Sequence, residues 1–452
     1  MATATTTSET GRIIGSAVPL IVTSLLQNAL PYVSVLAVSP LGTTELAAVS
    51  LATMTANITG FAVYQGLATS LDTLCAQAHG SGNKTLVGVH VQRMLLLICL
   101  VTVPIAAIWL NSEALLGLMV PQRETVRLAA IYLQVLCIGA PGWGMFESGK
   151  RYFQAQGLFL ASLYVLLLVA PVSVFLQWLF VWHFGWGFIG APIALSVTNY
   201  LLPGGLLVFG WIIGARQCWN RSSRAIFTDW GPMIRLAVPG LLMIEAEWLS
   251  FEIITLQASW LGEESLAAQS ILTSIVAIMA QISVPWSIAA ATRVGHLIGA
   301  GDPARAQTAA RSSALGSLAI GLLAGMLLLI FAHPIVQLFS PTPSVAQLAV
   351  RGLSIVAALQ VPDALANCMN SLLRGLGRQA FGAYVTLGCF YLIGLPISYV
   401  AAFVLHWGLY GLFVGPLVAQ SLITFVEGLT MLYGQDWQRA VDDARLRARL
   451  LP

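Results

Sequence analysis

The sequence is poor in charged residues. Asp, Glu, Lys and Arg make up 9% of its 452 residues, whereas a soluble globular protein has about 25%. This shortage excludes a soluble multidomain protein and a disordered chain. It also excludes a nucleic-acid-binding protein, which needs a basic face. The net charge of +3 is too small to indicate a partner.

The sequence also lacks the patterns of an enzyme. Its six His residues form no metal-binding cluster, and neither a Ser-His-Asp set nor a phosphate-binding loop is present. Gly80-Ser81-Gly82 opens no dinucleotide-binding unit and is expected to be a tight turn. The six Cys residues lie mainly in or beside apolar runs, so we expect free thiols. We expect no enzymatic activity, no catalytic residue, no metal and no cofactor.

Apolar residues, in contrast, make up 58% of the chain. About twenty such residues span a bilayer as a helix, and long runs without strict alternation cannot be barrel strands. We predict an all-α integral membrane protein with twelve transmembrane helices. The predicted helices cover 14–38, 46–72, 92–112, 126–149, 158–182, 188–213, 233–258, 266–291, 311–335, 346–371, 380–405 and 408–433.

Lys and Arg lie mostly on one side of this topology. Of the 21 basic residues, those predicted on the opposite side are Arg123, Arg127 and Arg351. Because basic loops stay in the cytoplasm, both termini are predicted to be cytoplasmic. The stretch from Arg439 to Arg449 is expected to be a solvated tail, with a helix lying on the membrane surface as the alternative.

The first half of the sequence is repeated in the second. Leu41 to Ser50 matches Leu261 to Ser270 at an offset of 220, and Gly157 matches Gly377 at the same offset. An offset of six helices makes the halves parallel repeats, which is the plan of an alternating-access transporter. A duplicated channel or scaffold is the alternative.

The repeat and the charges divide the chain into two pseudo-symmetric six-helix lobes and three cytoplasmic segments. The predicted parts are an N-terminal segment (1–13), an N-lobe (14–213), a linker (214–232), a C-lobe (233–433) and a C-terminal tail (434–452).

Acidic residues in the predicted spans are candidates for function, because an unpaired carboxylate costs several kcal/mol in a bilayer. The acids in or beside spans are Asp72, Glu147, Glu245, Glu247, Glu252, Asp363 and Glu427. Those of helices 7 and 10 have no evident Lys or Arg partner in a span. Such groups can exchange protons and attract an organic cation, and competition between the two is antiport.

The three acids of helix 7 do not share one face. Glu245 and Glu252 are seven residues apart and share a face, but Glu247 lies about 140° round from Glu252. For each acid the alternative is a structural carboxyl held by hydrogen bonds. Trp248 is a candidate to hold a cation on its ring. Asp72, at a helix end, favours a capping or gating role.

Motifs spread over nearly the whole chain match one known family. In the first half they run from Gly66 to Gln77. In the second half they are Glu247-Trp248 with Glu252, Val284-Pro285, Arg293-Val294-Gly295, Asp363-Ala364-Leu365 and Gly394-Leu395-Pro396. With these motifs the chain resembles the eukaryotic, plant-like branch of the multidrug and toxic compound extrusion (MATE) family.

The resemblance implies export of organic cations, drugs or metabolites against a proton or sodium gradient. The family's helix-7 glutamate falls on Glu247, its helix-10 acid on Asp363, and a second helix-7 acid of animal members on Glu252. A helix-8 glutamate of animal members falls on Ser274 and is missing, which argues against the substrate range of the animal kidney exporters. Gln27 is the first-half counterpart of Glu247, so the acids place ion coupling in the C-lobe.

The sequence therefore predicts a proton-coupled exporter of small organic cations and drug-like molecules in a plasma or vacuolar membrane. No nucleic acid and no obligate protein partner is expected. The predicted coupling and cation-binding residues are Glu247, Asp363 and Glu252; Gln27, Trp248 and Glu245 are expected to line the cavity, and Asp72 and Arg293 to have a gating or structural role.

Three alternatives stay open. They are a sodium-coupled antiporter of the same fold, a lipid-linked flippase and a passive channel. A flippase would favour a basic cavity for phosphate headgroups, whereas Lys and Arg are absent from the middle of the predicted spans.

Overall fold

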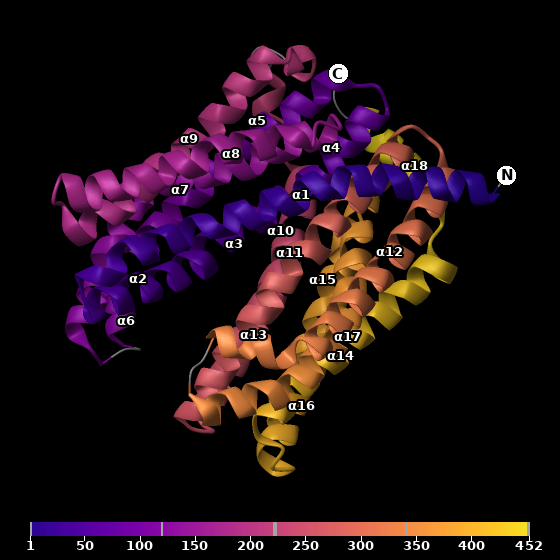
Figure 1. The fold of residues 1–452 in the computed structure, drawn as a ribbon. Coiled ribbons are helices and arrows are strands. Elements are labelled where there is room, and N and C mark those ends of the chain that lie inside the picture. The colour runs from indigo at the N-terminus through magenta and orange to yellow at the C-terminus, as the bar shows by residue number, and fades with distance from the viewer. Residues whose placement is uncertain (1, 119–120, 220–223, 340–341, 450–452) are drawn as a thin grey trace. The chain divides into compact units, whose positions relative to one another are not determined.

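The computed structural model describes residues 2–118, 121–219, 224–339 and 342–449, and in these ranges it is helical with no strand (Figure 1). Parts of the predicted linker (220–223) and tail (450–452) lie outside the described residues. The chain divides into two compact units. The N-unit comprises residues 22–237 and 448–452, and the C-unit comprises residues 1–21 and 238–447.

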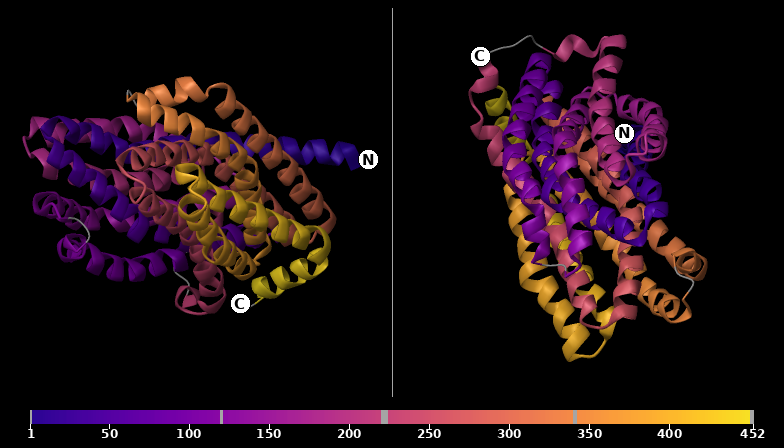
Figure 2. Two further views of the ribbon diagram at one scale, coloured as in Figure 1. Left: turned by 90° about the horizontal axis from the view of Figure 1, so that it is seen from below. Right: turned by 90° about the vertical axis from the view of Figure 1, so that its left-hand side faces the viewer.

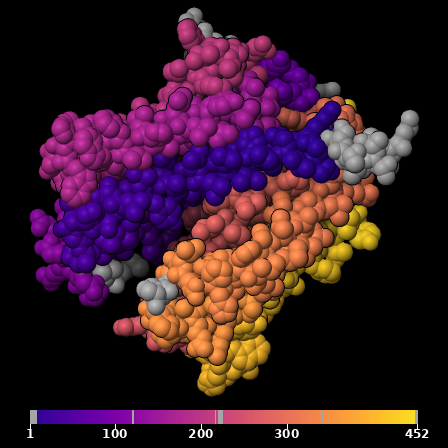
Figure 3. Space-filling model, in the orientation of Figure 1, coloured from indigo at the N-terminus to yellow at the C-terminus, as the bar shows by residue number. Residues whose placement is uncertain are grey.

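Both boundaries between the units fall inside helices. α1 (Ala2–Val38) is one continuous helix, which is indigo in Figure 1 and forms the indigo band of Figure 3, and its part up to Ile21 belongs to the C-unit. α10 (Gly231–Ser259) likewise begins in the N-unit and continues in the C-unit from Val238. The unit containing the last six spans is therefore completed by the start of the first helix.

The rest of the N-unit follows the order of the chain. Its helices are η1 (Ser39–Leu41), α2 (Thr43–Ala56), η2 (Asn57–Phe61), α3 (Ala62–Ala68), α4 (Ser70–Gly80), α5 (Lys84–Leu110), α6 (Ser112–Gly117), α7 (Arg123–Ala155), α8 (Leu160–Trp178), η3 (Leu179–His183), η4 (Gly187–Ile189), α9 (Gly190–Ile212), η5 (Ala215–Cys218) and η6 (Arg224–Phe227).

The C-unit contains the second set of helices, drawn from pink through orange to yellow in Figures 1 and 2. After α10 its helices are α11 (Glu263–Gly299), α12 (Pro303–Ile330), α13 (Ala332–Phe339), α14 (Pro343–Leu376), α15 (Gln379–Leu387), η7 (Gly388–Gly394), α16 (Leu395–Tyr399), η8 (Val400–Val404), α17 (Gly408–Leu429), η9 (Thr430–Gly434) and α18 (Trp437–Arg449).

In the described part of the chain, eleven helical runs are long and apolar enough to cross a membrane. α10 is long enough as well, with 29 residues, but Glu245, Glu247 and Glu252 lower its hydropathy. Together these twelve runs follow the twelve predicted segments in order, with ends that differ by several residues. The prediction of an all-α membrane protein with this plan is confirmed.

The internal repeat is visible in the turns of the backbone. Gly82 and Gly301 have φ values of 83° and 78°, a conformation that glycine adopts without strain. The next residues, Asn83 and Asp302, cap α5 and α12 by accepting hydrogen bonds from backbone N–H groups three residues on. Equivalent positions therefore fold alike in the two units.

Both ends of the described chain are helical. α1 begins at Ala2, so residues 2–13 of the predicted N-terminal segment (1–13) belong to this helix. A solvated tail was expected at the C-terminus, but α18 is a helix whose Ala440, Val441 and Ala444 pack into a buried cluster with Leu373 of α14. Because the sequence of α18 is polar overall, its one apolar face was not recognised from the sequence. The six Cys residues are free, as predicted.

α14 is held closely in the C-unit because glycines on its neighbours lie against it. A Cβ added at Gly321 of α12 would come within 2.8 Å of the Gln360 carbonyl oxygen of α14, and one at Gly325 within 2.7 Å of the Ala357 oxygen. Small residues let membrane helices approach to backbone contact. These contacts fix the position of Asp363, one turn after Gln360 on α14.

Candidate functional site

The C-unit brings two acids together around one amide. Gln420 Nε2 of α17 donates hydrogen bonds to Asp363 Oδ1 of α14 at 2.8 Å and to Glu247 Oε1 of α10 at 3.3 Å. Gln420 and Asp363 are buried, and Glu247 is half-buried. The two carboxyl groups thus accept from the same nitrogen. We call this set the acid pair, with Gln420 as its shared donor.

The backbone around Asp363 is opened by the proline that precedes it. Pro362 has no N–H and so interrupts the hydrogen-bond ladder of α14. Thr424 Oγ1 of α17 donates to the Pro362 carbonyl at 3.2 Å, and Asn367 Nδ2 donates to the Asp363 carbonyl at 3.0 Å. Both bonds are additional to the helical ones at these carbonyls, and the Thr424 bond ties α17 to α14 at the site.

The other predicted residues of α10 do not join the acid pair through any described bond. Glu245 and Glu252 are half-buried, and Glu245 Oε1 has no hydrogen-bond partner among the described residues. The side chain of Trp248 is 43% exposed. This agrees with the helical spacing, which does not let all three acids face one pocket. The α10 residue that meets Asp363 is Glu247.

The N-unit holds a different set of buried polar groups at the corresponding place. Gln27 Nε2 of α1 donates to Glu147 Oε1 of α7 at 2.8 Å, and Lys150 Nζ donates to Gln27 Oε1 at 2.6 Å. Glu147 also pairs with Lys150 and Arg151, each at 2.7 Å, and Arg151 pairs with Asp72 of α4 at 3.2 Å. The set therefore contains two acids and two bases, and we call it the N-unit ion cluster.

The two sets differ in how their charge is balanced. In the N-unit ion cluster, Lys150 and Arg151 neutralise Glu147 and Asp72. In the ion pairs of the described residues, neither Glu247 nor Asp363 takes part. An acid buried without a bound cation is neutralised by a proton or by a positive ligand. The acid pair can do such chemistry, whereas the N-unit ion cluster has its charges already matched.

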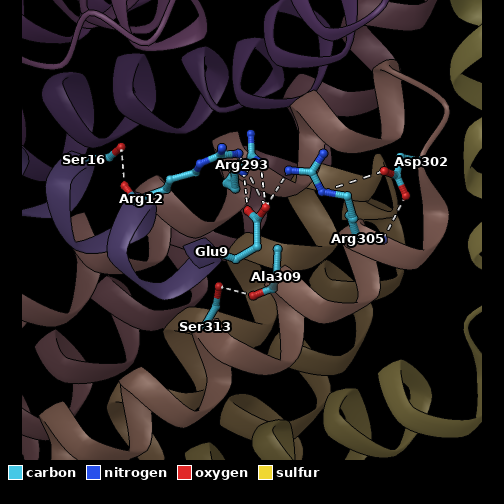
Figure 4. A network of polar contacts seen from close by, with 8 residues as sticks. All are labelled: Glu9, Arg12, Ser16, Arg293, Asp302, Arg305, Ala309 and Ser313. Carbon is cyan, nitrogen blue, oxygen red and sulfur yellow. Dashed lines mark hydrogen bonds and ion pairs between the residues drawn. The ribbon is translucent and has the colours of Figure 1, made fainter. Parts of the chain in front are cut away.

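A third polar cluster fastens the start of α1 within the C-unit, as Figure 4 shows. Glu9 accepts hydrogen bonds from Arg293 of α11 at 2.6 and 2.9 Å and from Arg305 of α12 at 2.8 Å. The Glu9 side chain is 3% exposed, while Arg305 is 47% exposed. Arg293, predicted to have a gating or structural role, is thus placed in an ion pair with α1.

Several of these hydrogen-bond and ion-pair partners were not identified from the sequence. Gln420 was missed, although a single amide in the middle of the apolar run 408–433 is the signal that could have found it. Glu9 was missed because it precedes the first apolar run. Ser274 donates to the Ser270 carbonyl of its own helix and is exposed.

A hollow of about 630 Å³ lies in the N-unit, and it is not at the acids. Its lining includes Tyr152 of α7, Trp211 of α9 and Trp219, and none of the described residues that line it is acidic. It is a mainly apolar groove.

Comparisons with known proteins agree with this architecture. The family model described as MatE matches residues 19–179 and 239–400, one stretch in each half of the repeat. An uncharacterised transporter of Schizosaccharomyces pombe is 38% identical over 95% of this chain and 80% of its own length. Multidrug and toxin extrusion protein 2 of Mus musculus is 30% identical over 98% of this chain and 77% of its own length. The crystal structure of the eukaryotic MATE transporter AtDTX14 superimposes with a TM-score of 0.93 at 27% identity and covers 98% of this chain and 100% of that one.

Proposed function

Because this chain belongs to the MATE family of transporters, we propose that it exports small organic cations and drug-like compounds in exchange for protons. The observation that carries the proposal is the acid pair, in which Glu247 and Asp363 share one amide donor and have no described cationic partner in an ion pair. The relatives named for multidrug and toxin extrusion support the class of substrate.

The exchange follows from charge neutrality in an apolar surrounding. With a proton on the acid pair the site carries less negative charge, and an organic cation is held weakly. When the proton leaves, a carboxylate remains that is costly in the bilayer unless a positive ligand binds it. Proton and substrate thus occupy the same site in turn, and alternating access makes this an antiport.

Gln420 favours protons over sodium as the coupling ion. Its amide nitrogen lies between the two carboxyl oxygens and donates to both. A sodium ion at that point would need oxygen ligands converging on it, and an N–H donor occupies the place instead. A proton needs no such ligand shell, because it binds to one carboxyl oxygen.

We also propose that both termini lie in the cytoplasm. The bias of Lys and Arg toward one set of connections supports this orientation. The location in a plasma or vacuolar membrane is tested by tagging the protein and imaging it in its own cells.

Transport into proteoliposomes tests the proposed function. Tetraethylammonium transport is measured with an imposed pH gradient and, separately, with an imposed sodium gradient. We expect transport to follow the pH gradient. Glu247→Gln is expected to abolish it while the protein is still produced in the membrane, and Glu264→Gln, an exposed acid of α11, serves as the matched control. Transport driven by sodium alone, or normal transport by Glu247→Gln, would refute the proposal.

A further inference from the structure

Another acid of the C-unit, Glu427, is more completely buried than either member of the acid pair. Glu427 of α17 has an exposed fraction of 0%, and both of its carboxyl oxygens lack a hydrogen-bond partner among the described residues. Burying a carboxyl without partners costs free energy. Nearly all buried polar groups are satisfied, so such a group calls for an explanation that packing does not give.

Glu427 belongs to a polar stripe shared by two packed helices. On α17, Gln420, Thr424 and Glu427 follow each other at intervals of four and three residues and so share one face. On α14, four polar residues follow each other at intervals of four, three and four residues, so this face is one turn longer than that of α17. They are Asp363, Asn367, Asn370 and Arg374.

The two faces of the polar stripe meet. α14 and α17 pack against each other, and Gln420 bonds to Asp363 at 2.8 Å while Thr424 bonds to the Pro362 carbonyl at 3.2 Å. From Gln420 to Glu427 the stripe extends about 10 Å along the helix at 1.5 Å per residue. One end of the stripe is therefore the acid pair, and the other end is Glu427 with Arg374.

The positive charge of Arg374 connects the two ends of the polar stripe, the acid pair and Glu427. It is a buried residue of α14, 9% exposed, and its charge acts both on Glu247 and on Glu427. Of the titratable groups on the other elements packed against α17, Cys389 of η7 lies close enough to Glu427 to interact with it electrostatically. Tyr384 of α15 and Tyr433 of η9 lie at the surface of the C-unit, with exposed fractions of 77% and 86%, whereas Glu427 is fully buried.

We propose that Glu427 is a second proton-binding carboxyl of the transport cycle, coupled to the acid pair through Arg374 and the polar stripe. This inference rests on the proposed function and adds a residue to it. In the step concerned, an O–H bond on Glu247 or Asp363 breaks, water between the polar side chains of the stripe carries the proton, and an O–H bond forms on a Glu427 carboxylate oxygen. The negative charge that Glu427 loses appears on the acid pair, where the organic cation binds. Arg374 balances Glu427 whenever Glu427 is ionised.

The alternative is a structural acid that only holds Arg374 in place. The two are separated by the pH dependence of transport, which a structural role leaves unchanged. A structural acid would also make the folded protein less stable when it is removed, whereas replacing an unsatisfied buried carboxyl by an amide is not expected to lower the melting temperature much.

The test compares Glu427→Gln, Glu427→Asp and Asn370→Leu with the wild type and with Glu264→Gln in proteoliposomes. Tetraethylammonium transport and proton movement, followed with an internal pH dye, are recorded at several pH values. We expect Glu427→Gln to bind tetraethylammonium in detergent but to transport at least about a hundredfold more slowly, the scale of a lost proton-transfer group, with an altered pH profile. Glu427→Asp should restore much of the rate, and Asn370→Leu, which interrupts the polar stripe without touching an acid, should slow it.

Glu427→Gln with the wild-type rate and pH profile would overturn the inference while leaving the proposed function intact. If Glu427→Gln does not fold, Asn370→Leu decides the matter, because a wild-type rate for that variant contradicts a stripe that carries protons. Failure of the proposed function itself would appear differently, as a wild-type protein that moves no protons with its substrate.

Discussion

Gln27 and Glu247 occupy equivalent positions in the two halves of the repeated sequence, yet they lie in opposite electrostatic settings. Gln27 of α1 bridges Glu147 and Lys150 in a cluster of matched charges. Glu247 of α10 shares an amide with another acid and has no described ion pair. One duplicated scaffold thus carries a neutralised set of charges in one unit and an acidic set in the other.

Asp363→Asn should remove proton coupling. The amide cannot carry the exchangeable proton, so proton-driven tetraethylammonium transport is expected to fall by about a hundredfold or more, the scale of a lost acid–base group. The measurement is initial transport rate between pH 6 and pH 8 in proteoliposomes. Asp442→Asn, which changes an exposed residue of α18, is the control, and full activity of Asp363→Asn at every pH would show that Asp363 has no such role.

Gln420→Ala should weaken coupling without removing either acid. Asp363 and Glu247 would both lose their shared hydrogen-bond donor, so the acid pair would be less well positioned and more costly to ionise. We expect a transport rate about tenfold lower, corresponding to roughly 1.4 kcal/mol, and a changed pH profile. Gln438→Ala, an exposed residue of α18, should behave as the wild type; if Gln420→Ala does too, the shared donor is unimportant.

Glu147→Gln should destabilise the N-unit. It leaves Lys150 and Arg151 buried with less negative charge beside them, and breaking one side of a buried ion pair costs about 3–5 kcal/mol. A lower melting temperature in detergent is the expected result. The double variant Glu147→Gln with Lys150→Gln restores the charge balance and should recover part of the loss. An unchanged melting temperature for the single variant would contradict the importance of the N-unit ion cluster.

Glu9→Gln should loosen the first turns of α1. Glu9 holds Arg293 and Arg305 at 2.6 to 2.9 Å, and hydrogen bonds to charged groups contribute about 1.5–3 kcal/mol each to stability. Faster amide hydrogen exchange in the first three turns of α1 is expected, with little change elsewhere. Glu113→Gln in α6, where the acid is exposed, provides the comparison, and equal exchange in both variants would argue against a fastening role for Glu9.

The sequence was sufficient for the helices and for the repeat, because both depend on local signals. Apolar runs set the spans, and Gly82 and Gly301 mark the same turn in both halves. It also marked the acids in the predicted spans as unusual, since acids are rare in such runs. The resemblance to the family then selected Glu247 and Asp363 among them. These inferences needed no knowledge of how the helices pack.

The arrangement of the site could not be obtained in this way. Glu247 and Asp363 are far apart in the sequence, and their meeting depends on how α10, α14 and α17 pack and on the interruption at Pro362. Gln420 carries no charge and so gave a weak signal. The buried face of α18 and the ion pairs of Glu9 depend on tertiary contacts, which polarity patterns do not reveal.

The most direct test of the acid pair is proton release on substrate binding. Tetraethylammonium is added to the purified protein in weakly buffered detergent solution, and the pH change is recorded without any gradient. The wild type should release protons in proportion to the substrate bound, and Glu247→Gln and Asp363→Asn should release far fewer. Binding by the wild type with no release of protons across the range from pH 5 to pH 9 would contradict the exchange of proton and cation at this site.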